Sequence, residues 1–305
     1  MRLRLIVNAA ATGVRGPVLD AVIAALKEVA DIEVAATEYA GHATELAAAA
    51  TEDAVVALGG DGTYNEVVNG LPAGEVLGVV PAGASSVFAR QLGFVNDPAA
   101  AARQLAAALR SGSTRSIGLG VADGRAFTFA AGLGLDAEAT AIVDAARHER
   151  PGNERPGDLQ VLATALRVLR AEGYALHERM TLIADDGSSY RCSYLAVANQ
   201  HPYTFLGPIP VRAAPRADYA HGLDAVFTHE LRGRQLWRLP VYALIWPRHA
   251  RRGSRHVGYL HDLHGFAVEC DEPTAFQIDG EYVGHRERVR FSYRPNAVRV
   301  LVPAQ

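Results

Sequence analysis

The chain has 305 residues, of which 49% are hydrophobic and 21% charged, a balance that excludes a disordered or fibrous protein. Its formal net charge of -3 offers no general attraction to a phosphate polymer, so we expect no nucleic-acid partner and only local anion sites. The length exceeds that of a single typical core and predicts two domains.

The first third of the chain alternates short apolar runs with helical segments, which is typical of parallel βαβ units. The predicted strands are residues 3–7, 32–37, 54–58 and 76–80. A helix opened by Pro17 follows the first strand, and a helix at 98–110 closes the domain. Residues 54–58 show no alternation, as expected of a central strand buried on both faces.

After residue 116 the pattern changes to alternating β-branched and aromatic stretches, which predict an antiparallel β-domain. The turn signals Asp185-Asp186-Gly187 and Asp279-Gly280 mark hairpins within it. One helical segment, residues 158–170, is predicted to interrupt the strands.

The cysteines and the apolar runs bear on the location of the protein. Cys192 and Cys270 stand in apolar, strand-like stretches, which favours buried free thiols and a reducing compartment. The apolar run near the start is too short for a signal peptide, and the longest run elsewhere, 239–246, is far below the roughly 20 residues that cross a bilayer. We therefore expect a cytoplasmic chain without a membrane span.

The histidines give no zinc motif. His256, His261 and His264 cluster without the helical spacing and interposed acid of zinc hydrolases, so solvated or hydrogen-bonded side chains are expected. No metal-ligand set follows from the residues.

The most informative stretch is Gly59-Gly60-Asp61-Gly62-Thr63, directly after the buried strand and before a helix. Its glycines let bare backbone N–H groups approach an anion, as phosphate loops require, and the carboxyl edge of a parallel sheet is where α/β domains bind ligands. Thr63 and Glu66, three residues later, predict a capping box for that helix, which is a structural alternative to a role in binding.

Asp61 is harder to explain as a plain turn residue. A carboxylate about 4 Å from a phosphate charge is repelled by ~4 kcal/mol at an effective dielectric of 20, so it needs a compensating role. Two roles fit: holding Mg²⁺ through water, or taking the proton from an incoming hydroxyl as the general base of phosphoryl transfer.

Residues 59–71 resemble the signature of the diacylglycerol kinase catalytic-domain family, which includes bacterial lipid kinases and the sphingosine and ceramide kinases. Further motifs of that family follow in order along nearly the whole chain. They are Asn8 with Gly13, Thr37 with residues 41–43, residues 81–83 with 88–90, residues 132–136, and residues 277–281.

The resemblance implies a fold of two classes, α/β plus all-β. A three-layer α/β nucleotide-binding domain with a parallel sheet would comprise residues 1–117, joined by 296–305. A lipid-binding antiparallel β-sandwich would comprise 118–295, with the active site in the cleft between the two domains.

The resemblance also implies roles for individual residues. Asp61 would be the base toward a lipid hydroxyl, Asp279 and Glu281 would reach the phosphates and the metal, and Asp136 would contact the acceptor. The residues expected on the ATP side are Asn8, Thr37, Gly59, Gly60, Gly62, Thr63, Glu66, Gly83, Ser85 and Arg155. Asp279-Gly280 is also a strong hairpin signal without any catalytic role, and this alternative stays open.

Two loops depart from the family pattern. The first lacks the usual proline after Asn8. In the third, Ala84 to Val87 replace the usual hydroxyl, amide and carboxylate residues, which puts in doubt a metal network joining that acid to Asp61. Ser85 and Ser86 still offer hydroxyls and N–H groups at an expected helix start, a natural anion site.

The resulting hypothesis is an ATP- and Mg²⁺-dependent lipid kinase acting on a diacylglycerol-like or sphingoid hydroxyl at a membrane surface. Aromatic and arginine residues within 237–255 suggest peripheral contact with the inner membrane face, and a core helix is the alternative. A kinase of a soluble alcohol, resembling NAD kinases, and a catalytically silent lipid- or nucleotide-binding relative remain alternatives. The residues name neither the lipid nor the oligomeric state, so a homodimer stays open.

Overall fold

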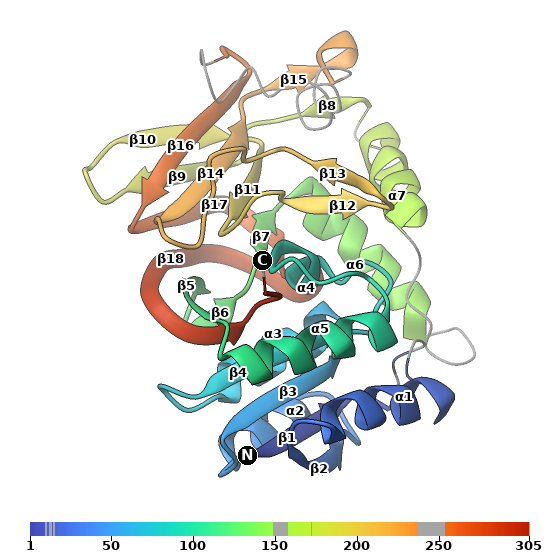
Figure 1. Cartoon of the computed structure of the whole chain (residues 1–305). Helices are drawn as coiled ribbons and strands as arrows, with labels where there is room; N and C mark the ends of the chain where they lie inside the picture. Colours follow the sequence, from blue (N-terminus) through green and yellow to red (C-terminus); the bar gives the residue numbers. More distant parts are fainter. Residues whose placement is uncertain are drawn as a thin grey trace. The chain divides into compact units, whose positions relative to one another are not determined.

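The computed structural model of the chain describes residues 1–9, 11, 14, 16–148, 158–171, 173–236 and 254–304 (Figure 1). Two compact units divide it. Unit 1 comprises Met1–Ile117 and Asn296–Gln305, and unit 2 comprises Gly118–Pro295.

Unit 1 is an α/β unit. Its strands are β1 (Arg2–Val7), β2 (Asp31–Ala36), β3 (Ala54–Gly59) and β4 (Val76–Pro81), in the parallel order β2-β1-β3-β4. Its helices are α1 (Gly16–Lys27), α2 (His42–Ala48), α3 (Asp61–Gly70), α4 (Val87–Gln91) and α5 (Pro98–Ser111). The last part of β18 (Glu281–Leu301) returns to pair in parallel with β4, with Val300 opposite Leu77. The four predicted strands are confirmed to within one residue at each end.

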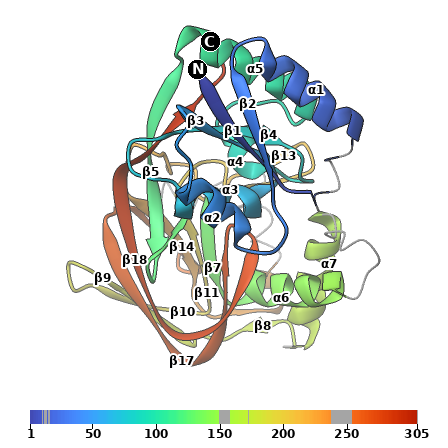
Figure 2. The same cartoon turned by 90° about the horizontal axis from the view of Figure 1, so that it is seen from below.

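Unit 1 has three layers because its central strand is apolar on both faces. All six residues of β3 are buried, and Val56 lies between Leu5 of β1 and Gly78 of β4. Helices α1 and α5 pack on one face of the sheet and α2 and α3 on the other, as Figure 2 shows. Asp97 starts α5 by accepting a hydrogen bond from the Ala100 amide (2.7 Å) just before Pro98.

Unit 2 is rich in antiparallel strands. Its strands include β5 (Thr114–Ala122, which enters from unit 1), β6 (Arg125–Phe127), β7 (Ala130–Leu133), β8 (Ala175–Leu176), β9 (Met180–Ala184), β10 (Ser189–Cys192), β11 (Tyr194–Ala198), β12 (Thr204–Leu206), β13 (Ile209–Val211), β14 (Leu223–Thr228), β15 (Leu231–Arg232), β16 (Val257–Leu263), β17 (Gly265–Ile278) and the first part of β18. The main order is β16-β14-β11-β7-β17-β18, and β9 and β10 extend from β17. These pairs are antiparallel, so the predicted fold class is confirmed.

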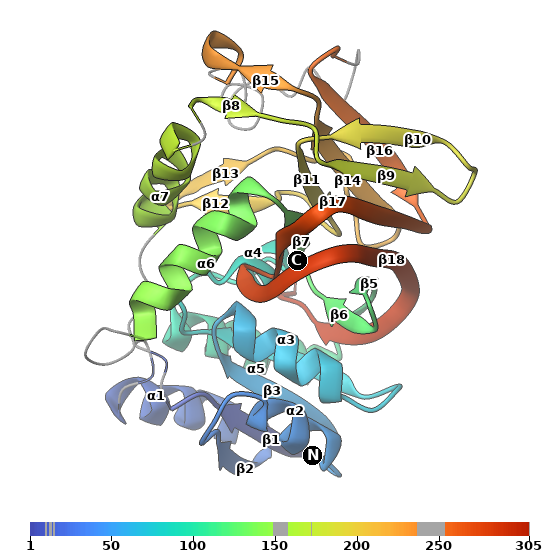
Figure 3. The same ribbon diagram turned by 180° about the vertical axis from the view of Figure 1, so that it is seen from behind.

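The hairpin predictions for unit 2 are confirmed, and one helix was missed. Asp279 (φ 47°) and Gly280 (φ 74°) form the two-residue turn between β17 and β18, and both have the left-handed backbone that such a turn requires. The prediction of a single helix is wrong, because α6 (Leu135–His148) precedes α7 (Asp158–Ala171) and packs against it (Figure 3). The buried Ala139 and Val143 of α6 have helical spacing, a signal that the glycine motif before them obscured.

The core of unit 2 is built on aromatic rings. Phe266 stacks on Phe291 with ring centroids 4.8 Å apart, and Phe276 packs edge-on against Phe291 at 6.1 Å. Cys192 lies in this core, and burial raises the pKa of its thiol to about 12. Cys192 and the half-buried Cys270 are free thiols, as predicted. Among the described residues, no helix combines the length and the apolar character needed to cross a membrane.

Candidate active site

Several of the predicted nucleotide-binding residues lie at one edge of the sheet in unit 1, because parallel strands end on the same side. Asn8 follows β1, Thr37 follows β2, and the amide group of Asn8 donates to the hydroxyl of Thr63 at the start of α3 (2.9 Å). The backbone amide of Thr37 donates to the carbonyl of Val7 (2.9 Å). The loops after β1, β2 and β3 are therefore tied to one another at this edge.

The loops after β3 and β4 meet backbone to backbone. A Cβ atom on Gly83 would lie only 2.8 Å from the Cα atom of Gly60, so this approach requires glycine. The amide of Ala82 donates to the carbonyl of Gly59 (2.7 Å). The buried hydroxyl of Tyr64 lies 2.9 Å from the carbonyl of Gly59 and 3.0 Å from that of Val80, which fixes the two strand ends together.

Asp61 is the first residue of α3, and its carboxylate binds the start of α4. Its oxygens accept hydrogen bonds from the backbone amides of Val87 (2.9 Å) and Phe88 (3.0 Å), and the residue is 5% exposed. The amides of Val87 and Phe88, which directly follow Ser85 and Ser86, therefore bind an anion of the chain itself. These two hydrogen bonds stabilise the buried charge of Asp61. Through them, Asp61 positions the loop that follows β4.

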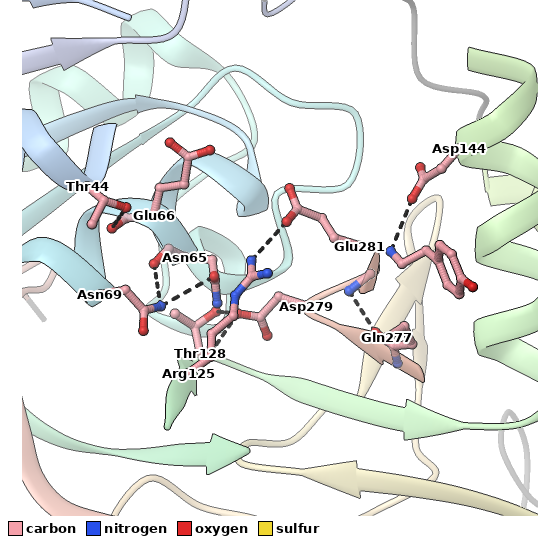
Figure 4. Close-up of polar contacts among 12 residues, drawn as sticks. Thr44, Asn65, Glu66, Asn69, Arg125, Thr128, Asp144, Gln277, Asp279 and Glu281 are labelled. Atoms are coloured by element: carbon pink, nitrogen blue, oxygen red, sulfur yellow. Dashed lines mark hydrogen bonds and ion pairs between the residues drawn. The ribbon is translucent and has the colours of Figure 1, made fainter. Parts of the chain in front are cut away.

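The predicted capping box of Thr63 and Glu66 is wrong. Helix α3 begins two residues earlier, at Asp61, and its N-cap Gly60 makes no side-chain cap. The carboxylate of Glu66 instead accepts from the amide of Ala43 at the start of α2 (3.1 Å), and Thr44 donates to the carbonyl of Glu66 (2.9 Å; Figure 4). Glu66 thus joins α3 to α2.

In unit 2, the buried carboxylate of Asp279 accepts hydrogen bonds from the segment between β6 and β7. The residue is 1% exposed, and its carboxylate accepts from the amide (2.7 Å) and hydroxyl (2.8 Å) of Thr128 (Figure 4). The amides of Phe129 (3.0 Å) and Ala130 (3.1 Å) donate to its other oxygen. This carboxylate stabilises the segment between β6 and β7 in addition to forming the hairpin turn.

Glu281 lies just beyond that turn and is more accessible. Its carboxylate pairs with Arg125 at 3.0 Å, and both side chains are about one-third exposed (Figure 4). The turn itself is held by Gln277, whose side-chain oxygen accepts from the amide of Gly280 (2.9 Å).

Asp136 is the centre of a polar cluster on unit 2 at the start of α6. One of its oxygens accepts hydrogen bonds from the hydroxyls of Tyr194 (3.3 Å) and Tyr203 (3.1 Å) and from the amide group of Gln277 (3.2 Å). The other accepts from the amide of Ala137 (2.7 Å). Burial raises the pKa of Asp136 from 3.8 to about 6, although these hydrogen bonds oppose the shift. We call Asp136, Tyr194, Tyr203 and Gln277 the Asp136 cluster.

Sequence reasoning found Asp136 but missed its partners. Gln277 lies in the motif formed by residues 277–281, yet no local pattern connects it with Asp136, which is 141 residues away. The tyrosines had no signal beyond an aromatic strand pattern. Burial raises the pKa of the hydroxyls of Tyr194 and Tyr203 well above the usual value, and the charge of Asp136 adds to the shift, so both stay donors at neutral pH.

The structure also bears on the predictions for a metal site, for the histidines and for the membrane segment. Within the described ranges, no three His, Cys, Asp or Glu side chains are grouped to hold a metal ion. His261 is hydrogen-bonded, as expected, with its Nδ1 2.6 Å from the buried Asp224. Arg155 and residues 237–253 of the proposed membrane segment lie outside the described residues. The cleft between the domains stays a prediction.

Known proteins resemble this chain in its first part and in its fold. The profile of the diacylglycerol kinase catalytic domain matches residues 2–121. Diacylglycerol kinase of Bacillus subtilis (strain 168) is 40% identical over 111 residues, which are 34% of this chain and 36% of that protein. Diacylglycerol kinase of Staphylococcus aureus (strain JH9) is 43% identical over 84 residues, or 26% of this chain and 27% of that protein. The matched segments thus span about a third of these relatives.

The likeness to solved structures extends over the whole chain. A diacylglycerol kinase from Bacillus anthracis str. Sterne has a TM-score of 0.71 at 18% identity and covers 99% of this chain and 96% of that one. A second structure from the same organism has a TM-score of 0.76 at 21% identity, with 99% and 95% covered. At such identities the likeness shows the fold. Residues 2–121 are thus similar to the diacylglycerol kinase catalytic domain, and the chain as a whole shares the fold of these two structures.

Proposed function

We propose that this chain is an ATP-dependent lipid kinase that transfers the γ-phosphoryl group of ATP to a hydroxyl of a diacylglycerol-like or sphingoid lipid. The observation that carries the proposal is the contact between Gly60 and Gly83, within the segment that the family profile matches. Two glycine loops that meet at the carboxyl edge of a parallel sheet leave backbone N–H groups accessible to phosphate oxygens.

In this proposal, the acceptor binds at the Asp136 cluster of unit 2. Tyr194, Tyr203 and Gln277 are neutral donors, and Asp136 with a pKa of about 6 is mostly ionised at neutral pH. A carboxylate held by neutral donors can accept a hydrogen bond from an alcohol and orient its oxygen. In the reaction this oxygen bonds to the γ-phosphorus, the bond to the bridging oxygen of ADP breaks, and a base takes the hydroxyl proton.

Mg²⁺ commonly binds one or two carboxylates together with substrate phosphates. Within either unit taken alone, the described carboxylates do not form such a site: those of Asp61 and Asp279 are occupied by backbone amides, and that of Glu281 pairs with Arg125. The assay below includes Mg²⁺ because the family resemblance implies it.

The experiment is a transfer assay with purified protein, Mg²⁺ and ATP labelled at the γ-phosphate. The acceptors are dihexanoylglycerol, sphingosine, glycerol and NAD. We expect label in a lipid product, and Asp136→Asn should lower kcat/KM for the acceptor at least tenfold while the KM for ATP stays within twofold. Label in NAD or glycerol alone would establish the soluble-alcohol alternative, and no label with any acceptor would contradict the proposal.

The predicted role of Asp61 as the base needs a separate test, because both of its oxygens already bind amides of α4. If Asp61 acts only as the base, Asp61→Asn should abolish turnover and leave ATP affinity and stability unchanged. If Asp61 positions the loop after β4, the same variant should also bind ATP more weakly, and its free energy of unfolding should fall by ~1–3 kcal/mol because the new NH₂ group faces an amide donor. Isothermal titration with ATP and urea unfolding distinguish the two outcomes.

A further inference from the structure

The hairpin β12–β13 of unit 2 forms a two-stranded sheet of its own. Its eight residues, 204–211, include only one polar side chain, that of Thr204, and no charge. None of them is buried, and Ile209 at the start of β13 is 50% exposed. Both strands of this apolar hairpin are partly exposed to water, which marks it as a site of contact with an apolar environment.

The charges around the hairpin suit an anionic surface. From residue 187 to residue 217 the chain contains no Asp or Glu. Arg212 directly follows β13, Arg216 comes four residues later, and both are exposed. An apolar tip flanked by cations is the pattern of elements that lie in the interface of a bilayer containing anionic lipids.

The base of the hairpin belongs to the Asp136 cluster. Tyr203 immediately precedes β12, and its amide donates to the carbonyl of Val211 (3.0 Å), which closes the base. Its hydroxyl donates to Asp136 (3.1 Å). A lipid with its hydroxyl at Asp136 therefore lies at the foot of the hairpin, within the same unit.

We propose that the β12–β13 hairpin inserts into the interface of an anionic bilayer and that this insertion brings membrane-embedded acceptors to Asp136. The inference rests on the proposed function for its acceptor and on the hairpin alone for its membrane contact. Val34 on β2 of unit 1 is also exposed (45%), but it lies between Glu33 and Ala35 and has no link to the Asp136 cluster, so it provides a matched control.

The test compares the double variant Leu206→Glu/Ile209→Glu with the matched control Val34→Glu. Each protein is sedimented with phosphatidylcholine vesicles, with and without phosphatidylglycerol. We expect the wild type and the control to bind the anionic vesicles and the hairpin variant to lose at least tenfold in affinity. The hairpin variant should phosphorylate vesicle-embedded diacylglycerol at least tenfold more slowly, yet keep its turnover of dispersed dihexanoylglycerol within twofold.

A second measurement covers the case in which the glutamates disturb folding. Ile209→Cys in a Cys270→Ser background, labelled with an environment-sensitive fluorophore, should show a blue-shifted emission on anionic vesicles. A probe at Val34→Cys should not. Unchanged emission at residue 209, or equal vesicle binding by the hairpin variant, would overturn the inference even if the lipid is phosphorylated. Vesicle binding that depends on the hairpin, without transfer to any acceptor, would instead overturn the proposed function alone.

Discussion

The carboxyl group of Asp136 has a pKa of about 6, so its protonation changes in an accessible range. The folded chain binds this proton more tightly than the unfolded chain, so proton binding at Asp136 stabilises the fold. This contribution to the free energy of unfolding is fully present below pH 4 and is lost as the pH rises through 6. A difference of about two pH units corresponds to ~3 kcal/mol.

Asp136→Asn should remove this dependence. Urea unfolding at pH 4.5 and 7 should show that the stability of the wild type relative to the variant falls by ~2 kcal/mol at the higher pH, because part of the full contribution is already lost at pH 4.5. Asp186→Asn is the control, because the hydrogen bonds from Ser188 lower the pKa of Asp186 and place its transition below this window. If the wild type and Asp136→Asn differ in free energy of unfolding by the same amount at both pH values, burial does not raise the pKa of Asp136.

Replacing the buried Asp279 is predicted to lower the stability of the fold. Asp279→Asn turns an NH₂ group toward amide donors of Thr128 or Phe129, leaving donors without an acceptor in a fully buried place. We expect the free energy of unfolding to fall by ~2–4 kcal/mol, as measured by urea titration. Unchanged stability together with lost turnover would instead assign this carboxylate to the chemistry.

At the residue scale, the sequence predicts which side chains are unusual but not what they contact. Asp61 and Asp279 stand out as charges beside glycine, yet their partners lie 26 to 151 residues away. Glu66 looks like a helix cap and is one, but for α2 rather than for its own helix. Local spacing contains no information on which distant amide comes near, so the partners follow only from the tertiary fold.

At the element scale, the close approach of the loops after β3 and β4 makes Gly83 a sensitive position. Gly83→Ala places a methyl group 2.8 Å from the Cα atom of Gly60, so one loop must move. We expect at least a tenfold loss of ATP affinity and ~1–3 kcal/mol of stability. Gly16→Ala, where nothing lies within 4 Å of the new Cβ, is the matched control and should change neither by much. Calorimetric titration with ATP checks the first expectation.

The elements themselves followed well from the sequence where the local signal was strong. The apolar run of β3 and the Asp279-Gly280 turn were predicted because burial on both faces and left-handed turn residues leave clear patterns. Helix α6 was missed because its start coincides with a glycine-rich strand end. The isolated hairpin β12–β13 has an apolar pattern that cannot, by itself, be told from a core strand.

At the scale of the whole molecule, unit 1 depends on the last residues of the chain. Val300 is fully buried beside Leu77 of β4, although about 220 residues separate them. Deleting residues 296–305 should therefore expose the edge of β4, and hydrogen exchange should show lost amide protection in β4 with little change in β11 and β14. Unchanged protection of β4 would contradict this dependence.

Because β5 leaves unit 1 and β18 returns to it, unit 2 is an insertion in the middle of unit 1 rather than an appended module. Recombination between relatives could not exchange unit 2 by joining two genes end to end. It would have to replace an internal cassette at two junctions, one in each of these strands, and each junction would have to preserve the alternation of inward and outward side chains. Chimeras with related chains should accordingly fold only when both crossovers keep strand register.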